Sequence, residues 1–263
     1  LSSLFIRIVE MQCNPLQFFP VCAIITMNLI HSRIQKSPLF SFEFKKALSL
    51  EEVRAYFAII LCAVIVITLN IAGSFRSIFA AITAAAFQVG SIITTTGYST
   101  TDFDLWPTFS KYLLILLMFV GACAGSTGGG VKVSRFIILI KTFFKEIVTY
   151  IHPKSIKKIQ MDDKPIEHEV VRSTNVFFLT FMTTFVLSVL VLSWDKEDFV
   201  TCFTAVAATI NNIGPGLSLV GPTANYGFYG WLSKLVLCFD MLVGRLEIFP
   251  ILLLFVPGTW KRF

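Results

Sequence analysis

The sequence predicts an all-α transmembrane protein. Of its 263 residues, 55% are hydrophobic and only 14% are charged, whereas a soluble domain carries about 25% charged residues. A chain with so few charges cannot cover a surface that faces water. Long apolar runs alternate with short polar loops, and residues 91–102 form a hydroxyl-rich loop between two such runs. Polar irregular backbone at membrane depth is stable only inside protein or beside a water-filled path.

The charge distribution predicts which side of the membrane each loop faces. The formal net charge is +6, and most basic residues lie in the segments 33–54, 132–172 and 261–262. Acidic residues dominate the loops 102–104 and 195–198, on the opposite side of the predicted spans. Because Lys and Arg accumulate on the cytoplasmic side, the basic segments are expected there. This pattern favours membrane lipid over nucleic acid as a partner.

The first predicted unit begins with residues 55–72, an uncharged apolar run. A span needs about 20 residues at about 1.5 Å rise each, so this run can cross a bilayer. Residues 75–93 are apolar and alanine-rich but are interrupted by the polar residues Arg76 and Gln88. They lead into the threonine-rich loop. They predict a re-entrant pore helix, after which the chain returns through residues 102–107.

The unit closes with a second, interrupted crossing. Apolar character starts at residues 111–121, breaks at the glycine-rich stretch 125–130 and resumes at 131–148. Residues 153–172 are polar and charged, which predicts a cytoplasmic linker.

The same organisation then appears again. Residues 176–193 predict a span, 199–213 a second soft helix that leads into a glycine-containing loop, and 231–256 a final span. Aligning Gly97 with Gly214 places the two units 117 residues apart. The predicted organisation is an N-terminal remnant, a pore unit, a cytoplasmic linker and a second pore unit: residues 1–40, 41–150, 151–172 and 173–263.

The threonine-rich loop has the composition of a cation filter. Gly97 allows backbone dihedrals that are closed to other residues, and the carbonyls of Thr94, Thr95 and Thr96 can then face an axis. Such oxygens replace the hydration shell of potassium. The matching loop, 212–216, places Gly214 before Pro215. The alternatives are an ordinary extracellular loop for the first and a simple turn after a helix for the second.

The glycine-rich stretch 125–130 is followed by Val131 and Lys132. A nucleotide-binding P-loop needs Lys directly after its second Gly, so nucleotide binding is rejected. A flexible break in mid-span predicts a gate below the filter, with a packing kink as the alternative. An intramembrane enzyme that uses Ser126 as nucleophile is a further alternative, in which Lys132 is the evident base.

Ionisable residues at apparent membrane depth predict function, because they are costly unless paired or wet. Arg245 is best placed to face the interior and hold the glycine-rich stretch, and Asp240 and Glu247 are its candidate partners, with Lys132 also a candidate member of this group. Snorkelling to the interface is the alternative. The three histidines and six cysteines are scattered, so no metal site and no cofactor is expected.

Four ordered motifs resemble the TrkH-type potassium uptake proteins of the TrkH/KtrB/HKT superfamily: residues 91–107, 121–132, 211–216 and 244–249. The resemblance implies potassium transport rather than an enzymatic activity, by a multi-pass protein of the bacterial inner membrane. That family has four span–pore-helix–span repeats around one pore, and this chain resembles repeats three and four. The N-terminal half of the pore, which this chain lacks, would then be a partner. Residues 1–40 show no clear match to the family. A nonfunctional fragment stays an alternative, and symport with H+ or Na+ is left open.

The resemblance also implies roles for individual residues. The implied filter residues are Thr95, Thr96, Gly97, Asn212, Ile213 and Gly214, flanked by Thr94, Tyr98, Asn211 and Pro215. The implied gate residues are Gly125, Ser126, Thr127, Gly128, Gly129, Gly130, Lys132 and Arg245. Members of the family form homodimers and bind a cytosolic TrkA-like nucleotide-binding subunit, and the basic cytoplasmic segments are the expected contact surface.

Overall fold

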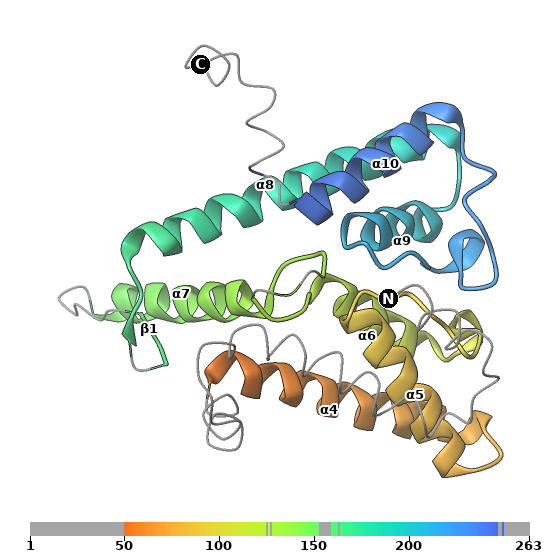
Figure 1. Ribbon diagram of the computed structural model, residues 1–263, viewed down its shortest axis with the longest axis horizontal. Helices are drawn as coiled ribbons and strands as arrows, with labels where there is room; N and C mark the ends of the chain where they lie inside the picture. Colours follow the sequence, from red (N-terminus) through yellow and green to blue (C-terminus); the bar gives the residue numbers. More distant parts are fainter. Residues whose placement is uncertain are drawn as a thin grey trace, which may run out of the picture.

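The computed structural model in Figure 1 describes residues 50–124, 126, 128–152, 159–162, 164–246 and 249. This part of the chain consists of helices joined by short turns, with one two-stranded hairpin. The predicted N-terminal remnant, residues 1–40, lies outside the described residues. So does almost all of the last predicted span after residue 246.

The first unit contains three packed helices: α4 (Glu51–Ile71), α5 (Ile78–Ile93) and α6 (Thr108–Phe119). The 3-10 turns η2 (Ala72–Ser74) and η3 (Phe103–Leu105) connect them. Each helix contacts the other two. The predicted span and soft helix are therefore present as helices, although α4 starts earlier than the apolar run because its first turn is acidic, which favours a helix N-terminus.

Two more long helices follow: α7 (Val133–Ile151) and α8 (His168–Leu192). Between them the strands β1 (Gln160–Met161) and β2 (Lys164–Pro165) form an antiparallel hairpin. The sequence predicted a polar cytoplasmic linker up to residue 172 and did not indicate the hairpin or the start of α8 at residue 168. Two-residue strands show no alternation to detect, and hydropathy marks only the apolar part of a helix that extends beyond it.

The second unit contains η4 (Ser193–Asp195), α9 (Phe199–Ile210), η5 (Ser218–Val220) and α10 (Trp231–Leu246). Helix α9 is the most enclosed element, with nine of its twelve residues buried. It packs against α8 and α10 of its own unit and against α6 of the first. The soft, alanine- and threonine-rich composition thus marks a helix surrounded by other helices.

The two units lie one above the other in Figure 1, with α8 and α10 side by side in the upper layer and α4 below α7. Contacts of α7 with α8 and of α6 with α9 join the units. The loops that follow α5 and α9 both lie toward the interior, where one hydrophobic core cluster includes residues of both units.

Two helical stretches, Glu51–Ser74 and His168–Asp195, are long and apolar enough to cross a membrane, and α5, α6 and α9 are shorter apolar helices. Length and composition alone are weak evidence, since the core helix of a soluble protein passes the same test. However, only 28% of each apolar window is buried, and Leu61, Leu69 and Leu179 are 63%, 75% and 68% exposed. Exposure of this kind fits a lipid-facing surface.

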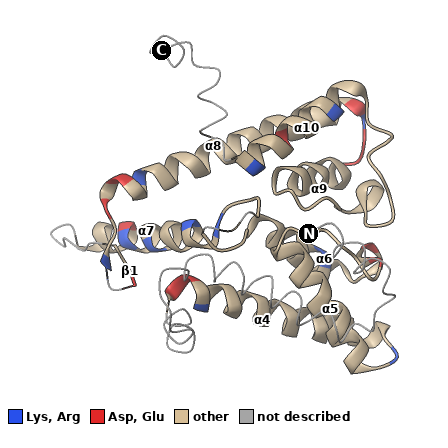
Figure 2. Cartoon of the chain, viewed as in Figure 1, with Lys and Arg blue, Asp and Glu red and all other residues tan. Residues whose placement is uncertain are grey.

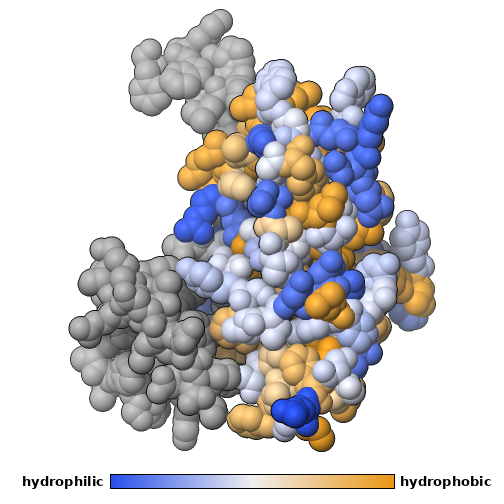
Figure 3. Space-filling view, turned by 90° about the vertical axis from the view of Figure 1, so that its right-hand side faces the viewer, coloured by the Kyte–Doolittle hydropathy of each residue, from blue (hydrophilic) through white to orange (hydrophobic). Residues whose placement is uncertain are grey.

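The distribution of charged and apolar residues agrees with a lipid-facing surface. In Figure 2 the charges of α8 lie at its N-terminal end and the rest of the helix is uncharged, while Lys and Arg follow one another along α7. Figure 3 shows apolar side chains reaching the surface in several patches of the face in view. Charges confined to helix ends are the distribution that a bilayer requires.

Candidate ion filter and glycine-loop gate

Helices α5 and α9 both begin with a side-chain cap and both end at a glycine-containing loop. The Ser77 hydroxyl accepts the N–H of Phe79 at 3.3 Å, and the Asp198 carboxylate accepts the N–H of Val200 at 3.1 Å. The partial negative charge of a helix lies at its C-terminal end. Each helix therefore directs the end that attracts a cation toward its loop.

The loop after α5, called here the first filter loop (residues 94–98), folds back onto the last turn of its helix. The N–H of Thr95 donates to Ile92 O at 3.0 Å, and the N–H groups of Thr96 and Gly97 both donate to Ser91 O, at 2.9 and 3.4 Å. Three consecutive N–H groups thus point at α5.

The second filter loop (residues 211–215) repeats this pattern after α9. Here the N–H of Asn212 donates to Thr209 O at 2.9 Å, and the N–H groups of Ile213 and Gly214 both donate to Ala208 O, at 2.8 and 3.3 Å. Every donor and acceptor lies 117 residues after its counterpart in the first filter loop. The sequence identity of the loops is low, so the shared feature is the path of the backbone.

Both filter loops alternate the sign of φ. Thr95 and Gly97 have φ of 57° and 73°, and their counterparts Asn212 and Gly214 have 55° and 107°. A left-handed conformation costs a non-glycine residue free energy and is concentrated at functional sites. In a trans peptide the C=O of one residue points opposite to the N–H of the next. The N–H groups of residues 95–97 and 212–214 point at the helices. The carbonyls of residues 94–96 and 211–213 therefore point away from them.

The two filter loops touch each other at Gly97. A Cβ built there would overlap the carbonyl oxygen of Ile213 and would lie 3.2 Å from the Cδ of Pro215. Only glycine fits, because the site needs both a positive φ and the absence of a side chain.

Side chains brace the two filter loops differently. In the first filter loop, the Ser91 hydroxyl donates to Tyr98 O at 2.5 Å and the Thr94 hydroxyl donates to Gly90 O at 2.6 Å. In the second, the Asn211 amide donates to Ala207 O at 2.7 Å. Position 208 holds alanine where the first unit has Ser91, so it offers no matching hydroxyl.

The second filter loop is held instead by residues outside α9. The Tyr226 hydroxyl donates to Gly214 O at 2.6 Å, and the Asn212 amide donates to Met241 O on α10 at 3.1 Å. The sequence analysis did not find Tyr226. No local pattern could have identified it, because the hydrogen bond joins two loops whose approach depends on the fold.

The interrupted crossing forms a closed excursion between α6 and α7, called here the glycine loop (residues 121–132). Val120 and Val131 form a parallel β-bridge at its neck, and the N–H of Gly121 donates to Val131 O at 2.9 Å. The loop leaves the helical path and returns to it at nearly the same place. Gly125 and Thr127, two of the predicted gate residues, lie outside the described residues.

The glycine loop lies directly against both filter loops. A Cβ at Gly129 would come within 2.5 Å of Asn211 O, and one at Gly128 within 3.3 Å of the Thr95 hydroxyl oxygen. Gly130 has φ of 79°. The run of glycines thus allows backbone to approach backbone with no side chain between them.

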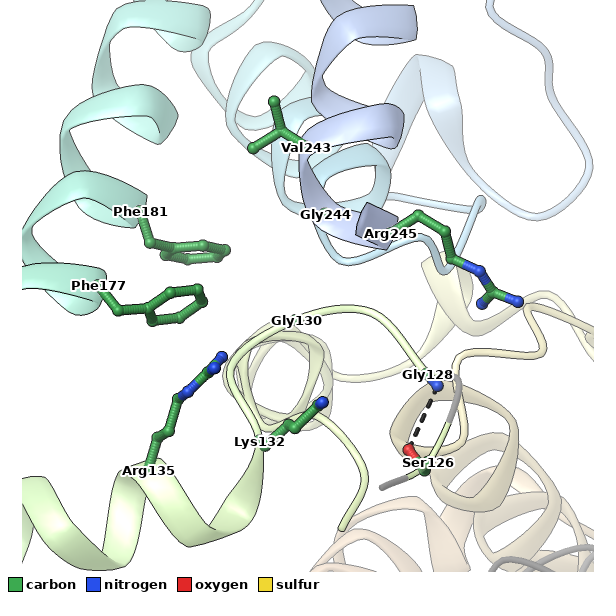
Figure 4. Close-up of a pocket in the computed structure, with 10 residues that line it drawn as sticks. All are labelled: Ser126, Gly128, Gly130, Lys132, Arg135, Phe177, Phe181, Val243, Gly244 and Arg245. Atoms are coloured by element: carbon green, nitrogen blue, oxygen red, sulfur yellow. Dashed lines mark hydrogen bonds between the residues drawn. The ribbon is translucent and has the colours of Figure 1, made fainter. Parts of the chain in front are cut away.

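A cavity of about 70 Å³ opens beside the glycine loop. Figure 4 shows Lys132 and Arg135, at the start of α7, and Arg245, on α10, around it. The Arg135 guanidinium also stacks 3.9 Å from the ring centroid of Phe177 on α8. The predicted gate residues Lys132 and Arg245, far apart in sequence, therefore line one cavity.

Ser126 belongs to the same cavity lining. Its hydroxyl oxygen accepts the N–H of Gly128 at 3.2 Å, the dashed contact in Figure 4. This contact shapes the loop and uses only one of the acceptor positions of the hydroxyl. A nucleophile would also have to donate its proton to a base.

Asp240 was one predicted partner of Arg245, and the structure gives it a different contact. Its carboxyl oxygen Oδ1 accepts a hydrogen bond from the Ser188 hydroxyl at 2.8 Å, and both side chains are buried between α8 and α10. The other predicted partner, Glu247, lies outside the described residues. Sequence spacing could not reveal Ser188, which is one of many hydroxyl residues on these helices.

Comparisons with known proteins match residues 18–261 to the family TrkH, described as a cation transport protein. The matched range includes part of the N-terminal segment for which the motifs had no counterpart. The chain is similar to the Trk system potassium uptake protein TrkH of Vibrio parahaemolyticus, with 40% identity over 188 residues, 72% of this chain and 38% of that protein. It is 34% identical to TrkH of Escherichia coli over 204 residues, 78% of this chain and 41% of that protein.

The fold is similar to a solved structure, that of the potassium transporter TrkH from Vibrio parahaemolyticus. The TM-score is 0.73 at 38% identity, covering 80% of this chain and 45% of that one. The chain thus spans less than half the length of each of these relatives.

Proposed function

The chain belongs to the TrkH family of cation transport proteins, and we propose that it forms part of a pore that conducts potassium into the cell. Its two filter loops would supply two of four sets of backbone carbonyls, and the other half of the pore would supply the rest. The names of the relatives, potassium uptake proteins, support potassium as the transported ion.

One observation carries this proposal: two loops of different sequence follow the same backbone path after two helices. In each, three N–H groups bond to the preceding helix and three carbonyls point away from it. Carbonyl oxygens arranged in this way can replace the water shell of a dehydrated cation. The cation-attracting helix ends behind them add to the attraction.

The glycine loop is proposed to be the gate. It touches Asn211 and Thr95 from one side, and it borders the cavity with Lys132 and Arg245. A segment in that position obstructs ion movement when it lies against the filter loops and permits it when it moves away. Arg245 would regulate this movement through its charge.

The proposed setting is a multi-pass protein of the bacterial inner membrane, with residues 41–150 and 173–263 as successive pore units. Homodimer formation and contact with a cytosolic TrkA-like nucleotide-binding subunit are part of the proposal. The basic surface of α7 supports such a contact on the cytoplasmic side. No resident cofactor is proposed, because potassium is the transported substrate.

The test expresses a complete four-unit pore that contains this sequence in a bacterial strain without potassium uptake systems of its own. The measured quantity is potassium uptake. Gly97→Ser should sharply reduce the preference for potassium over sodium, because it strains a positive φ and meets the Ile213 carbonyl. Gly90→Ser is the matched control, since a Cβ there meets nothing within 4 Å. Unchanged selectivity in Gly97→Ser would refute the filter assignment.

Expression of the chain alone separates an active half-pore from the alternative of a nonfunctional fragment. Growth at low external potassium would indicate assembly of this chain into a working pore. The serine-enzyme alternative is tested by Ser126→Ala, which should abolish an enzymatic activity and leave conduction largely intact.

A further inference from the structure

The second filter loop lacks one internal brace of the first, the hydrogen bond from Ser91 to the Tyr98 carbonyl. Ser91 on α5 donates to the carbonyl of Tyr98 and so fixes the outer end of the first loop. The counterpart of Ser91 on α9 is Ala208, which is fully buried and has no donor on its side chain. The second loop therefore needs another group to hold its outer end.

Gly214 lies in more open surroundings than its counterpart. Its φ is 107°, and a Cβ built on it would meet nothing within 4 Å, whereas a Cβ on Gly97 would overlap the Ile213 carbonyl oxygen. The peptide that follows Gly214 joins Pro215, whose ring lies near Gly97. A hydrogen bond to the Gly214 carbonyl adds a second restraint on the orientation of that peptide.

Tyr226 supplies that hydrogen bond from the loop between α9 and α10. Its hydroxyl lies 2.6 Å from Gly214 O, at the short end of the range for an O–H donor. Its ring stacks on Tyr229, with centroids 6.3 Å apart and an interplanar angle of 30°, and Tyr229 is only 2% exposed. The donor is thus anchored to a buried neighbour.

The hydroxyl stays protonated in the physiological range. Burial raises the pKa of Tyr226 above its ordinary value. A neutral phenol donates one hydrogen bond, so the contact with Gly214 persists across the pH values at which the protein works.

We propose that Tyr226 is a positioning residue that holds the Gly214 carbonyl, anchors the outer end of the second filter loop beside the Ile213 carbonyl and thereby sets the ion preference of that loop. This inference rests on the proposed potassium pore. Discrimination between cations depends on the number and orientation of the coordinating carbonyls. Without the anchor, the carbonyls of residues 211–213 would adapt to a smaller ion and lose that discrimination.

The experiment compares Tyr226→Phe with Tyr229→Phe in the complete pore. Each change removes one hydroxyl and keeps the ring, but only the Tyr226 hydroxyl bonds to the second filter loop. The measured quantity is the permeability ratio of potassium to sodium in proteoliposomes, together with the total potassium flux. Tyr226→Phe should lower the ratio about tenfold, the effect of one hydrogen bond of about 1.4 kcal/mol, with flux retained.

Tyr229→Phe should keep the ratio of the unmodified protein. The proposal is overturned if Tyr226→Phe also keeps that ratio, or if both variants lower it equally, since the second result would mean general loosening of the loop. Absence of potassium flux in the unmodified pore would instead count against the proposed function. Folded protein is verified for every variant by its elution as a single species and by its thermal unfolding.

Discussion

Asn211 points its side-chain oxygen at Gly130, so closely that a Cβ on Gly130 would come within 2.7 Å of it. The backbone oxygen of Asn211 lies against Gly129 in the same way. A single fully buried residue at the base of the second filter loop thus contacts two successive glycines of the proposed gate. Filter and gate meet without any intervening layer of side chains.

Gly130→Ala is expected to push the glycine loop away from the second filter loop. The new methyl group would crowd Asn211, and the positive φ of 79° adds strain of about 1–3 kcal/mol. Basal rubidium uptake into vesicles that lack any regulatory subunit should rise. Gly73→Ala is the control, because its Cβ meets nothing within 4 Å. Equal basal uptake in both variants would contradict a gating role.

Arg245→Ala should also raise basal flux, by removing a positive charge beside the proposed ion path. A fixed positive charge repels a passing potassium ion, and Arg245 lines the cavity at the glycine loop. Rubidium uptake is expected to increase severalfold, and more at low ionic strength. Arg76→Ala, an exposed arginine between η2 and α5, should leave uptake unchanged. A fall in uptake for Arg245→Ala would refute the electrostatic reading.

Ser188→Ala should destabilise the second unit without changing ion preference. The substitution leaves the buried Asp240 carboxyl without its hydroxyl donor, which costs about 1–3 kcal/mol. Thermal unfolding in detergent measures the loss. Ser193→Ala is the matched control, since that exposed hydroxyl bonds only to Leu190 O of the same chain segment. If the two variants unfold at the same temperature, the hydrogen bond between Ser188 and Asp240 contributes nothing to the stability of the fold.

Alkaline pH should destabilise the fold partly through Tyr226. Burial raises its pKa above the ordinary value of about 10, so the folded state binds the phenolic proton more tightly than the unfolded chain does. This contribution is fully present below about pH 10 and declines as the pH rises toward the folded-state pKa. Unfolding temperatures between pH 8 and 11 should fall less steeply in Tyr226→Phe. Parallel curves for the two proteins would count against this linkage.

The helical framework could be predicted because uncharged runs are visible along the chain. Residues 55–72 and 176–193 were predicted to be spans, and α4 and α8 contain all but the last residue of each. The threonine-rich loop could also be predicted, because it is polar and lies between apolar segments. The pairing of Gly97 with Gly214 rested on organisation alone, and the matched hydrogen bonds of the two filter loops now give it a physical basis.

Other features depend on approach between distant segments. The β1–β2 hairpin is too short for alternation, and the Ser188–Asp240 contact joins residues 52 positions apart. Tyr226 could not be predicted either, because its contact with Gly214 also depends on the approach of two segments. Its neighbours in sequence, Asn225 and Gly227, indicate only a turn, and its role follows from the position of Gly214 in space.

The first turn of α4 holds two distant segments at once. The N–H of Glu51 donates to the Asp162 carboxylate of the hairpin at 2.7 Å, and the Glu51 carboxylate pairs with Lys141 of α7 at 2.6 Å. The adjacent Glu52 carboxylate accepts the N–H of Ala124, within the glycine loop, at 2.5 Å. Two neighbouring residues thus connect the hairpin, α7 and the proposed gate within one helical turn, so a movement of the hairpin would act directly on the glycine loop.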